Sequence, residues 1–545
     1  MMKVFQINKY LTLKLKDGKT FIYINKEEFK QCSYLLLNIP KNEIVSMENI
    51  ASIDEAAEWL NNSMEVGNEN PIKIPPEVEF WGHCSNLHAW AEHKYDPRLL
   101  HSNLSFPLLK KLTEVGDKTA KKVFKEEVAE RFRKGNINTK IYLLKEDYIT
   151  SEYFTKEETE VICEDLELEE FLKLDLEEAL SLLWKITNLG IEHAKPILRE
   201  KVIKLFRNQD YYQQKYILEQ GYLTILSQKE INELLSEINT TKFKSFIMRT
   251  KPLEAFPKYL LQFSKLRSLS YGGNSLKRFP EEICELTELE VLEYDYNNIK
   301  EFPECIGNLT KLESLDLSYN NLTELPEAFA KLENLRELNL NNNDFETFPE
   351  PLTKLSNLER LQIMRTKNLK KLSINIGNLK NLRTLILSYN SITELPESIG
   401  NLKKLEKLYL GNNNLETLPE SIGKMNNLKK LYLNNNNKIK KLPDSIGGLK
   451  NLRMLDLSDN NLETLPESIG NLIKLRELHL CYNNLRELPE SIKNLQNLYT
   501  ITIHHNTLNP YEYYLKYNLP VTQYVLENKE FFLKQLQQKH QKKKD

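Results

Sequence analysis

The C-terminal half of the 545-residue chain repeats itself with a period of 23 residues, and this period restricts the folds that it can adopt. The first unit begins at Phe243 and the pattern ends at Leu508; only the spacings that follow the unit starts at Leu358 and Leu428 are 24 residues. A fixed period of this length indicates a solenoid, because one short unit buries its apolar face only by stacking on its neighbours. The sequence therefore predicts a repeat domain of about 12 units over residues 241–508.

The unit that begins at Leu452 shows what each repeat contributes. It reads LRMLDLSDNNLETLPESIGNLIK. Side chains alternate along a strand, so Leu455 and Leu457 are expected to point inward, and Met454 and Asp456 outward. Strands from successive units then pair as a parallel sheet about 4.8 Å apart and share one leucine core.

An asparagine follows the predicted strand in most units, where the chain turns sharply. Its amide carries donors and an acceptor for backbone groups that have no partner in the sheet, and leaving one such buried group unpaired costs about 1–3 kcal/mol. We expect these asparagines to be structural and to form a ladder along the solenoid. The ladder comprises Asn274, Asn297, Asn320, Asn343, Asn390, Asn413, Asn436, Asn460, Asn483 and Asn506.

The unit that begins at Leu358 departs from this pattern. Thr366 replaces the ladder asparagine, one residue is inserted, and Leu372-Ser373 replaces the usual Leu-Pro. Drift in a tolerant repeat explains these changes, and a local bend that shapes the concave surface is the alternative.

The repeated pattern LxxLxLxxNxL followed by LPxxIxxLxx resembles that of intracellular leucine-rich repeat proteins, a class that includes animal Ras-pathway scaffold proteins and plant Ras-group repeat proteins. The resemblance implies an α/β solenoid with a concave parallel sheet, no catalytic residue in the repeats, no cofactor, and a protein partner, with small GTPase signalling as the narrower expectation. The segment Phe80–Leu112 also resembles archaeal leucine-rich repeat proteins of unassigned function.

Composition narrows the function classes. Lys and Arg number 75 against 77 Asp and Glu, so the net charge of −2 gives no general attraction to nucleic acid. Apolar runs such as Tyr34–Leu37 are far shorter than the roughly 20 residues of a membrane span, and the first ten residues lack the apolar core of a secretory signal. The six cysteines are scattered, which favours free thiols and a cytoplasmic protein.

The N-terminal part of the chain has a different pattern. Residues 1–62 predict a small α/β unit, because Leu11–Leu15 and Phe21–Ile24 alternate around the turn-forming pair Asp-Gly at 17–18, and Ile53–Leu60 predicts a short helix. The proline-containing residues 63–75 predict a linker.

Residues 76–240 show helical spacing and a second, longer repeat. The segment 108–148 aligns with 182–222 at a constant offset of 74 residues. The matched residues are apolar, aromatic, small or turn-forming, which indicates a duplicated packing unit rather than a duplicated active site. The pairs are Leu108/Leu182, Leu109/Leu183, Thr113/Thr187, Gly116/Gly190, Ala120/Ala194, Val128/Val202, Phe132/Phe206, Tyr142/Tyr216 and Tyr148/Tyr222.

One cluster in the helical part has the residue types of a metal or catalytic site. His83, Cys84, His88, His93 and His101 lie within 19 residues, and Cys84 and His88 share one face of a helix. A metal needs three or four converging ligands, so structural histidines are the favoured interpretation. A zinc site remains the alternative, and with it an enzyme, such as a ligase or hydrolase, whose repeats select the substrate.

The outward strand positions are free of the repeat's structural demands, so they carry most of the functional information. The early units are acidic there (Glu290, Glu293, Asp295, Glu313 and Asp316), and the middle units are mainly basic (Arg336, Arg360, Arg365, Arg383, Lys407, Lys429 and Lys430) but diluted by Glu337, Glu359 and Glu406. Tyrosines fill neighbouring columns: Tyr296, Tyr319 and Tyr389 at one strand position, and Tyr409 and Tyr432 at another. Tyr and Arg dominate protein-binding hot spots.

This face is therefore the predicted site for a protein partner, and the neighbouring acidic units argue against nucleic acid. The predicted contact residues are Glu293, Tyr296, Asp316, Tyr319, Arg336, Arg360, Arg383, Tyr389, Tyr409 and Tyr432.

Residues 509–545 are predicted to close the solenoid. An amphipathic pattern over Val521–Gln538 indicates a helix that covers the last strand, and Lys539–Lys544 reads as a solvated basic tail.

Overall fold

The computed structural model describes residues 3–30, 75–100, 102–164, 166–208, 210–249, 256–366, 368–508 and 516. The chain forms two compact units, Met1–Lys204 and Leu205–Asp545, and the division falls inside helix α9 (Ala194–Arg207). The predicted helix at 53–60, the linker at 63–74, and the C-terminal helix and tail lie outside the described residues. Among the described residues, no helix combines the length and hydrophobicity that a bilayer span requires.

The first unit begins with an antiparallel sheet. Its strands follow one another in chain order: β1 (Lys3–Gln6), β2 (Leu11–Lys16), β3 (Lys19–Ile24) and β4 (Glu27–Phe29). Lys16 pairs with Lys19 across a two-residue turn in which Asp17 and Gly18 have φ of 52° and 73°, as a tight hairpin requires. The hairpin predicted around residues 17–18 is confirmed.

The sheet packs directly on helix α2 (Pro76–Glu92). The ring of Phe5 lies edge-on to Trp81, with centroids 5.8 Å apart. The Tyr95 hydroxyl donates to Asp117 over 2.6 Å and accepts from the Asn8 amide over 2.9 Å. Strands and helices therefore belong to one packed unit.

Capped helices continue from α2 into the second unit. Asp117, Asp175 and Asp210 accept backbone N–H groups at the starts of α4, α8 and α10, and Thr155 forms a capping box with Glu158 at the start of α6. The helices are α3 (Ser102–Glu114), α4 (Lys118–Lys134), α5 (Ile137–Lys145), α6 (Lys156–Ile162), α7 (Leu168–Phe171), α8 (Leu176–Asn188), α9, α10 (Tyr211–Glu219) and α11 (Gln228–Ser236).

The 74-residue duplication is visible in local detail. Helices α3, α4 and α5 correspond to α8, α9 and α10. The hydroxyls of Thr113 and Thr187 each donate to the carbonyl four residues earlier over 2.8 Å. Gly116 and Gly190, which follow the corresponding helices, both have φ of 89°, a conformation that side chains disfavour. The matched residues therefore serve helix packing and turns.

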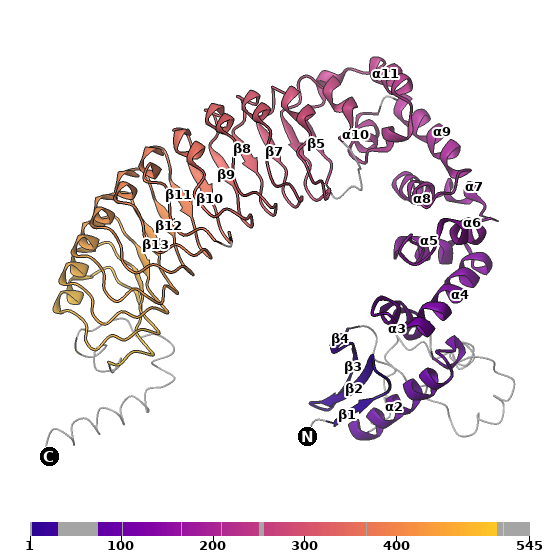
Figure 1. The fold of residues 1–545 in the computed structure, drawn as a ribbon, viewed down its shortest axis with the longest axis horizontal. Helices are drawn as coiled ribbons and strands as arrows, with labels where there is room; N and C mark the ends of the chain where they lie inside the picture. Colours follow the sequence, from indigo (N-terminus) through magenta and orange to yellow (C-terminus); the bar gives the residue numbers. More distant parts are fainter. Residues whose placement is uncertain are drawn as a thin grey trace. The chain divides into compact units, whose positions relative to one another are not determined.

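The second unit contains a 12-stranded parallel sheet in strict chain order, β5 to β16. Figure 1 shows the strands on the inner side of a curved solenoid and short 3₁₀ helices on the outer side. The predicted solenoid fold is confirmed. The strands are β5 (Ser245–Ile247), β6 (Ser268–Ser270), β7 (Val291–Glu293), β8 (Ser314–Asp316), β9 (Glu337–Asn339), β10 (Arg360–Gln362), β11 (Thr384–Ile386), β12 (Lys407–Tyr409), β13 (Lys430–Tyr432), β14 (Met454–Asp456), β15 (Glu477–His479) and β16 (Thr500–Thr502).

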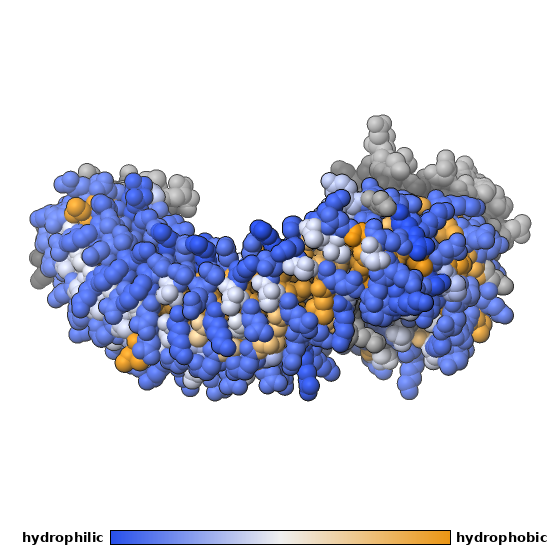
Figure 2. Space-filling model, turned by 90° about the horizontal axis from the view of Figure 1, so that it is seen from above, coloured by the Kyte–Doolittle hydropathy of each residue, from blue (hydrophilic) through white to orange (hydrophobic). Residues whose placement is uncertain are grey.

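The leucine core runs through every unit. Leu455 and Leu457 are fully buried, whereas Met454 and Asp456 are only partly buried, so the predicted strand register is confirmed. Ile469 and Leu472, from the outer 3₁₀ segment, close the core from the convex side with no exposed area. Figure 2 shows one face of the molecule, on which hydrophilic residues cover most of the repeat region.

Helices α10 and α11 cover the N-terminal end of the solenoid. The Tyr211 ring stacks on Phe243 with centroids 5.0 Å apart. The Glu219 carboxylate accepts the Ile247 N–H of the first strand over 2.8 Å, and Tyr259 donates to the Leu218 carbonyl over 2.8 Å. These helices lie before the domain boundary predicted at 240/241, and they belong to the same compact unit as the repeats.

Two cysteines on the convex side form a disulfide, Cys284–Cys305, with Cα atoms 5.7 Å apart. Each lies beside a buried isoleucine: Cys284 follows Ile283, and Cys305 precedes Ile306. In a later unit the equivalent pair is Gly400 and Ser421, so close that a Cβ on the glycine would collide with the serine.

The stacking of units therefore brings the two thiols together, which a scattered spacing does not reveal. The expectation that all six cysteines are free is wrong for this pair, while Cys84, Cys163 and Cys481 are free thiols.

The atypical unit keeps the sheet intact. Leu361 of β10 pairs in register with Leu338 and Leu385 of its neighbours. Thr366, which stands at the position of the ladder asparagine, donates its hydroxyl and N–H to the Asn390 side-chain oxygen over 2.6 and 2.9 Å. The changes in this unit therefore lie outside its strand.

Candidate functional site

The concave sheet presents the first and third residues of each strand, because the middle residue is buried in the core. In β12 and β13 these outward positions are Lys407 and Tyr409, then Lys430 and Tyr432. Parallel pairing places the two tyrosines side by side, and their rings stack with centroids 4.6 Å apart and planes 8° apart. Burial against the sheet, followed by the neighbouring Tyr409, raises the pKa of Tyr432.

The predicted basic sector is largely neutralised by a chain of ion pairs across successive units. Glu359 contacts Arg336 at 3.2 Å and Arg383 at 3.4 Å. Glu406 contacts Arg383 at 3.3 Å and Lys429 at 2.6 Å, and the hydrogen bond from Lys429 is the main reason that the pKa of Glu406 is lowered. Such exposed pairs contribute little energy individually, but they fix side-chain positions and cancel charge.

Two of the remaining cations, Lys407 and Lys430, lie beside the tyrosine pair. Arg360 contacts Glu337 at 3.6 Å. By contrast, no carboxylate among the described residues lies within ion-pair distance of Lys407 or Lys430. Lys407 and Lys430 therefore place positive charge beside Tyr409 and Tyr432.

The predicted acidic sector is also bonded within the protein. Asp316 accepts the Ser318 N–H and hydroxyl over 2.9 and 2.6 Å, and the Asn339 amide over 2.9 Å. Arg249 reaches over Gly272 to Asp295, with Nη1–Oδ1 of 2.9 Å, and to Glu293 at 3.2 Å.

Arg249 was missed in the sequence. A glycine, Gly272, occupies the same repeat position one unit later. A Cβ there would collide with the Asp295 carboxylate, so this glycine could have indicated the contact between Arg249 and Asp295. These contacts leave less free negative charge at this end of the sheet than the residue types suggest.

Tyr296, Tyr319 and Tyr389 do not lie on the strands. The prediction that they share a strand position is wrong, because each strand is only three residues long and they follow it by three residues, in the next turn. Their φ angles are 51°, 55° and 60°, in the left-handed region. These tyrosines therefore belong to the turn edge of the solenoid and not to the concave sheet.

Every unit from the second onward has a left-handed residue at this point, which we call the turn row. Gly, Asn and Asp tolerate this conformation, whereas other side chains cost about 1–2 kcal/mol there. Asn342, Asn412, Asn435 and Asp459 conform to that preference. The turn row consists of Gly273, Tyr296, Tyr319, Asn342, Arg365, Tyr389, Asn412, Asn435, Asp459, Tyr482 and His505.

Aromatic and cationic members of the turn row contact one another. The rings of Tyr296 and Tyr319 stack with centroids 4.0 Å apart and planes 9° apart. The Arg365 guanidinium lies 5.1 Å from the centre of the Tyr389 ring. One stacked pair is worth about 0.5–1.5 kcal/mol, which is less than the conformational cost of two tyrosines in the left-handed region.

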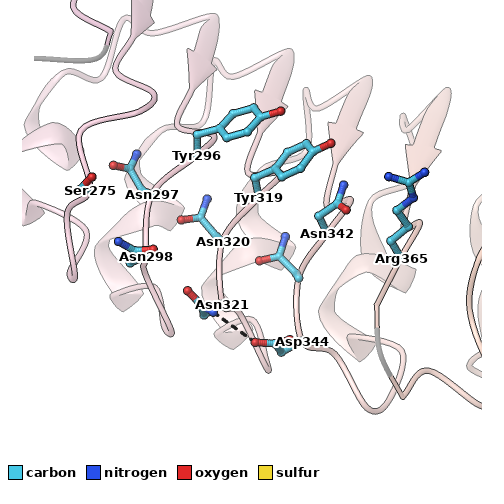
Figure 3. Close-up of a pocket in the computed structure, with 11 residues that line it drawn as sticks. Ser275, Tyr296, Asn297, Asn298, Tyr319, Asn320, Asn321, Asn342, Asp344 and Arg365 are labelled. Atoms are coloured by element: carbon cyan, nitrogen blue, oxygen red, sulfur yellow. Dashed lines mark hydrogen bonds between the residues drawn. The ribbon is translucent and has the colours of Figure 1, made fainter. Parts of the chain in front are cut away.

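A depression of about 440 Å³ lies along the turn row between Tyr296 and Arg365. Figure 3 shows the two tyrosines projecting in parallel, with Asn342 and Arg365 continuing the same line. A second line of polar side chains faces them: Ser275, Asn298, Asn321 and Asp344. The ladder asparagines lie between the two lines as the floor.

The ladder asparagines are fully engaged with backbone. Asn413 donates to the carbonyls of Leu387 and Leu410 over 3.0 Å each, and accepts the Ile392 N–H over 3.0 Å. Asn320 and Asn436 repeat this arrangement in their own units. Their amides hold turns together and have little capacity left for a ligand.

The histidines and cysteine of the helical part do not converge. His83 is buried with Nε2 3.3 Å from Glu79, His88 pairs with Glu92 at 3.2 Å, and the His93 ring contacts the Ala89 carbonyl. His101 lies outside the described residues. Within the described residues, no group of three or more His, Cys, Asp or Glu side chains could hold a metal ion.

Burial also makes Cys84 a poor nucleophile. Desolvation raises the pKa of its thiol to about 11, so the reactive thiolate is scarce at neutral pH. Burial lowers the pKa of His83, against the opposing effect of Glu79. Cys84 is therefore not activated as a nucleophile beside His83.

Comparison with known proteins agrees with the fold. A family model for a leucine-rich repeat region matches residues 248–375, 365–439 and 427–510. A search of curated protein sequences found no relative of the chain.

Solved structures similar to the chain include a leucine-rich repeat protein of Leptospira interrogans, with 26% identity, a TM-score of 0.31, and coverage of 51% of this chain and 94% of that one. A TDR receptor is 29% identical, with a TM-score of 0.45 and coverage of 51% of this chain and 50% of its own. An internalin of Listeria monocytogenes is 21% identical, with a TM-score of 0.40 and coverage of 56% and 92%. The match of the family model over residues 248–510 identifies the repeat region as a leucine-rich repeat domain.

Proposed function

We propose that the protein is a non-enzymatic interaction protein that binds a protein partner on the concave face of its leucine-rich repeat domain. Leucine-rich repeat domains typically bind proteins. The observation that carries the proposal is the stacked pair Tyr409 and Tyr432, flanked by Lys407 and Lys430. Rigid aromatic area surrounded by charge is typical of binding hot spots.

The charges indicate the character of the partner. The ion-paired chain from Arg336 to Lys429 is close to neutral, whereas Lys407 and Lys430 have no ion-pair partner among the described residues. A partner that places an apolar or aromatic side chain on the tyrosines and carboxylates near the lysines would complement this area. A component of small GTPase signalling is the narrower form of the proposal, and only the resemblance of the LPxxI repeats supports it.

An enzyme with chemistry in the helical part is the competing function. It would depend on Cys84 and the neighbouring histidines, and the raised pKa of Cys84 together with the separate partners of His83 and His88 argues against it.

The test begins with partners captured by the full-length protein and identified by mass spectrometry. The dissociation constant of each purified partner is then measured by calorimetry for the wild type and for Tyr409→Ala/Tyr432→Ala. We expect binding to weaken at least about 30-fold, which corresponds to about 2 kcal/mol. Lys430→Glu should mainly slow association and change its salt dependence.

Tyr212→Ala is the matched control, because this tyrosine is 79% exposed on helix α10 and is not part of a concave strand. A partner whose affinity is unchanged by the double substitution and by Lys430→Glu would exclude this face as its binding site. Loss of binding on Cys84→Ser, with the concave variants unaffected, would favour the helical part instead.

A further inference from the structure

Several units place at the turn row a residue type that its left-handed conformation disfavours. Four units place Asn or Asp at its left-handed position, so the fold has a low-cost solution there. Other units place Tyr296, Tyr319 and Arg365 at the same position, although it disfavours them.

Burial does not compensate for this choice, because Tyr296 is 53% exposed and Tyr319 is 39% exposed. Unfavourable conformations retained on an exposed surface are typical of binding sites.

We propose that the depression along the turn row from Tyr296 to Arg365 is a second protein-binding surface, which takes an extended polypeptide segment carrying an acidic side chain opposite Arg365. The surface lies on the edge of the solenoid, and its use does not depend on the concave face. It spans three steps between units, about 14 Å, which is the length of four to five extended residues.

The chemistry of the depression suits a polypeptide. One wall holds the stacked rings of Tyr296 and Tyr319, which offer a rigid amphipathic surface at low entropic cost. Asn298 and Asn321 on the opposite wall, and Asn342 next to the rings, are at least partly exposed amides with both donors and acceptors, as a peptide backbone requires. Tyrosine combined with Asn and Ser is the composition of surfaces that recognise proteins.

The charges at the two ends of the depression determine the direction in which the bound polypeptide lies. Arg365 is exposed above Tyr389, and its guanidinium has no carboxylate within ion-pair distance among the described residues. At the opposite end, Asp295 and Glu293 lie near the tyrosines and are paired with Arg249. An acidic side chain is therefore attracted to Arg365, whereas Arg249 at the Tyr296 end is already paired with carboxylates of the protein.

The first experiment measures stability in urea and needs no partner. Tyr296→Asn/Tyr319→Asn installs the residue type found at Asn342 and Asn412, so the unfolding midpoint should stay the same or rise. Asn435→Tyr is the reverse substitution at a turn-row position without an aromatic neighbour, and its midpoint should fall. A lower midpoint for the double variant would show that the rings are retained for stability, which overturns the proposal.

The second experiment uses a defined probe. A phage-displayed library of random 12-residue peptides is selected on the full-length protein and counter-selected on Tyr296→Asn/Tyr319→Asn. Selected peptides are synthesised and titrated by fluorescence. We expect enrichment of Asp or Glu, at least tenfold weaker binding to the double variant and to Arg365→Gln, and unchanged binding to Tyr409→Ala/Tyr432→Ala.

The outcomes separate the two surfaces. Peptides that lose affinity only with the concave substitutions would overturn the turn-row proposal and leave the concave proposal intact. Absence of any peptide that depends on Tyr296, Tyr319 or Arg365 would also overturn it. A panel of neutral oligosaccharides is titrated in parallel, and binding of a sugar with the same residue dependence, without peptide binding, would assign the depression to a glycan and contradict the proposal.

Discussion

Two pairs of tyrosines stack in almost the same way in the repeat domain, but they stand on different backbones. The ring centroids of Tyr409 and Tyr432 lie 4.6 Å apart on β12 and β13, where the extended conformation suits an aromatic residue. The ring centroids of Tyr296 and Tyr319 lie 4.0 Å apart, but both residues are in left-handed turns, a conformation that disfavours tyrosine.

Equal ring contacts therefore differ in what they say about function. A tyrosine on a strand is explained in part by its fit to a sheet, so the flanking free lysines are needed to argue for binding. A tyrosine at a left-handed position opposes the local preference, so its presence is itself evidence of another requirement.

The largest expected effect concerns the solenoid on which both pairs depend. A fragment of residues 205–545 should fold, whereas one of 241–545 should aggregate or lose cooperative unfolding. The shorter fragment exposes Phe243 and the backbone of β5, which α10 and α11 cover. Circular dichroism and size-exclusion chromatography of both fragments provide the measurement. Equal folding of the two would show that these helices are dispensable.

The next largest effect compares a core residue of β12 with Tyr409, which we place outside the core. Leu408→Ala should lower the free energy of unfolding by about 2–5 kcal/mol, because this side chain is fully buried between the sheet and the convex turns. Tyr409→Ala should cost less than about 1.5 kcal/mol, since it removes mainly one ring stack. Urea melts of both variants give the comparison, and similar losses would mean that the tyrosine is a core residue.

Two adjacent asparagines in one turn should differ in their contribution to stability. Asn413→Ala should destabilise by about 1–3 kcal/mol, because it leaves Leu387, Leu410 and Ile392 backbone groups without partners. Asn412→Gly should change stability by no more than about 0.5 kcal/mol, since glycine accepts its φ of 58°. A large loss for Asn412→Gly in thermal melts would contradict the interpretation of the turn row as a conformational constraint.

The smallest effect concerns charge on the concave face. The pKa of Glu406 is lowered below its ordinary value of 4.5, chiefly by Lys429, so its stabilisation is present above pH 4.5 and disappears as the pH falls through the lowered value. Glu406→Gln should therefore cost less than about 1 kcal/mol at pH 7 and nothing in strong acid.

Glu420→Gln on the convex side is the control for this prediction, because this carboxylate is exposed and no ion pair is found for it among the described residues. A constant difference between wild type and Glu406→Gln from pH 7 to pH 2 would exclude the ion-pair explanation.

The solenoid could be predicted from the amino-acid sequence alone. The 23-residue period, the leucines and the asparagine after each strand are local demands repeated in every unit, so the strand register of Met454–Leu457 could be derived from one unit. The hairpin at 17–18 was equally readable, because few residue pairs accept its turn. The 74-residue duplication survived as matched helices and turn glycines.

Contacts between neighbouring units, by contrast, could not be predicted from the sequence. Period and spacing do not show that Cys284 meets Cys305, that Arg249 reaches Asp295 across Gly272, or that Glu359 and Glu406 pair with the cations on either side. These contacts depend on the lateral spacing of neighbouring units.

The turn tyrosines were misplaced for a related reason. Alternation of side chains predicts direction only while the chain remains extended, and each strand here ends after three residues. A residue that follows the strand by three positions takes its direction from the left-handed turn, which is imposed by stacking against the next unit.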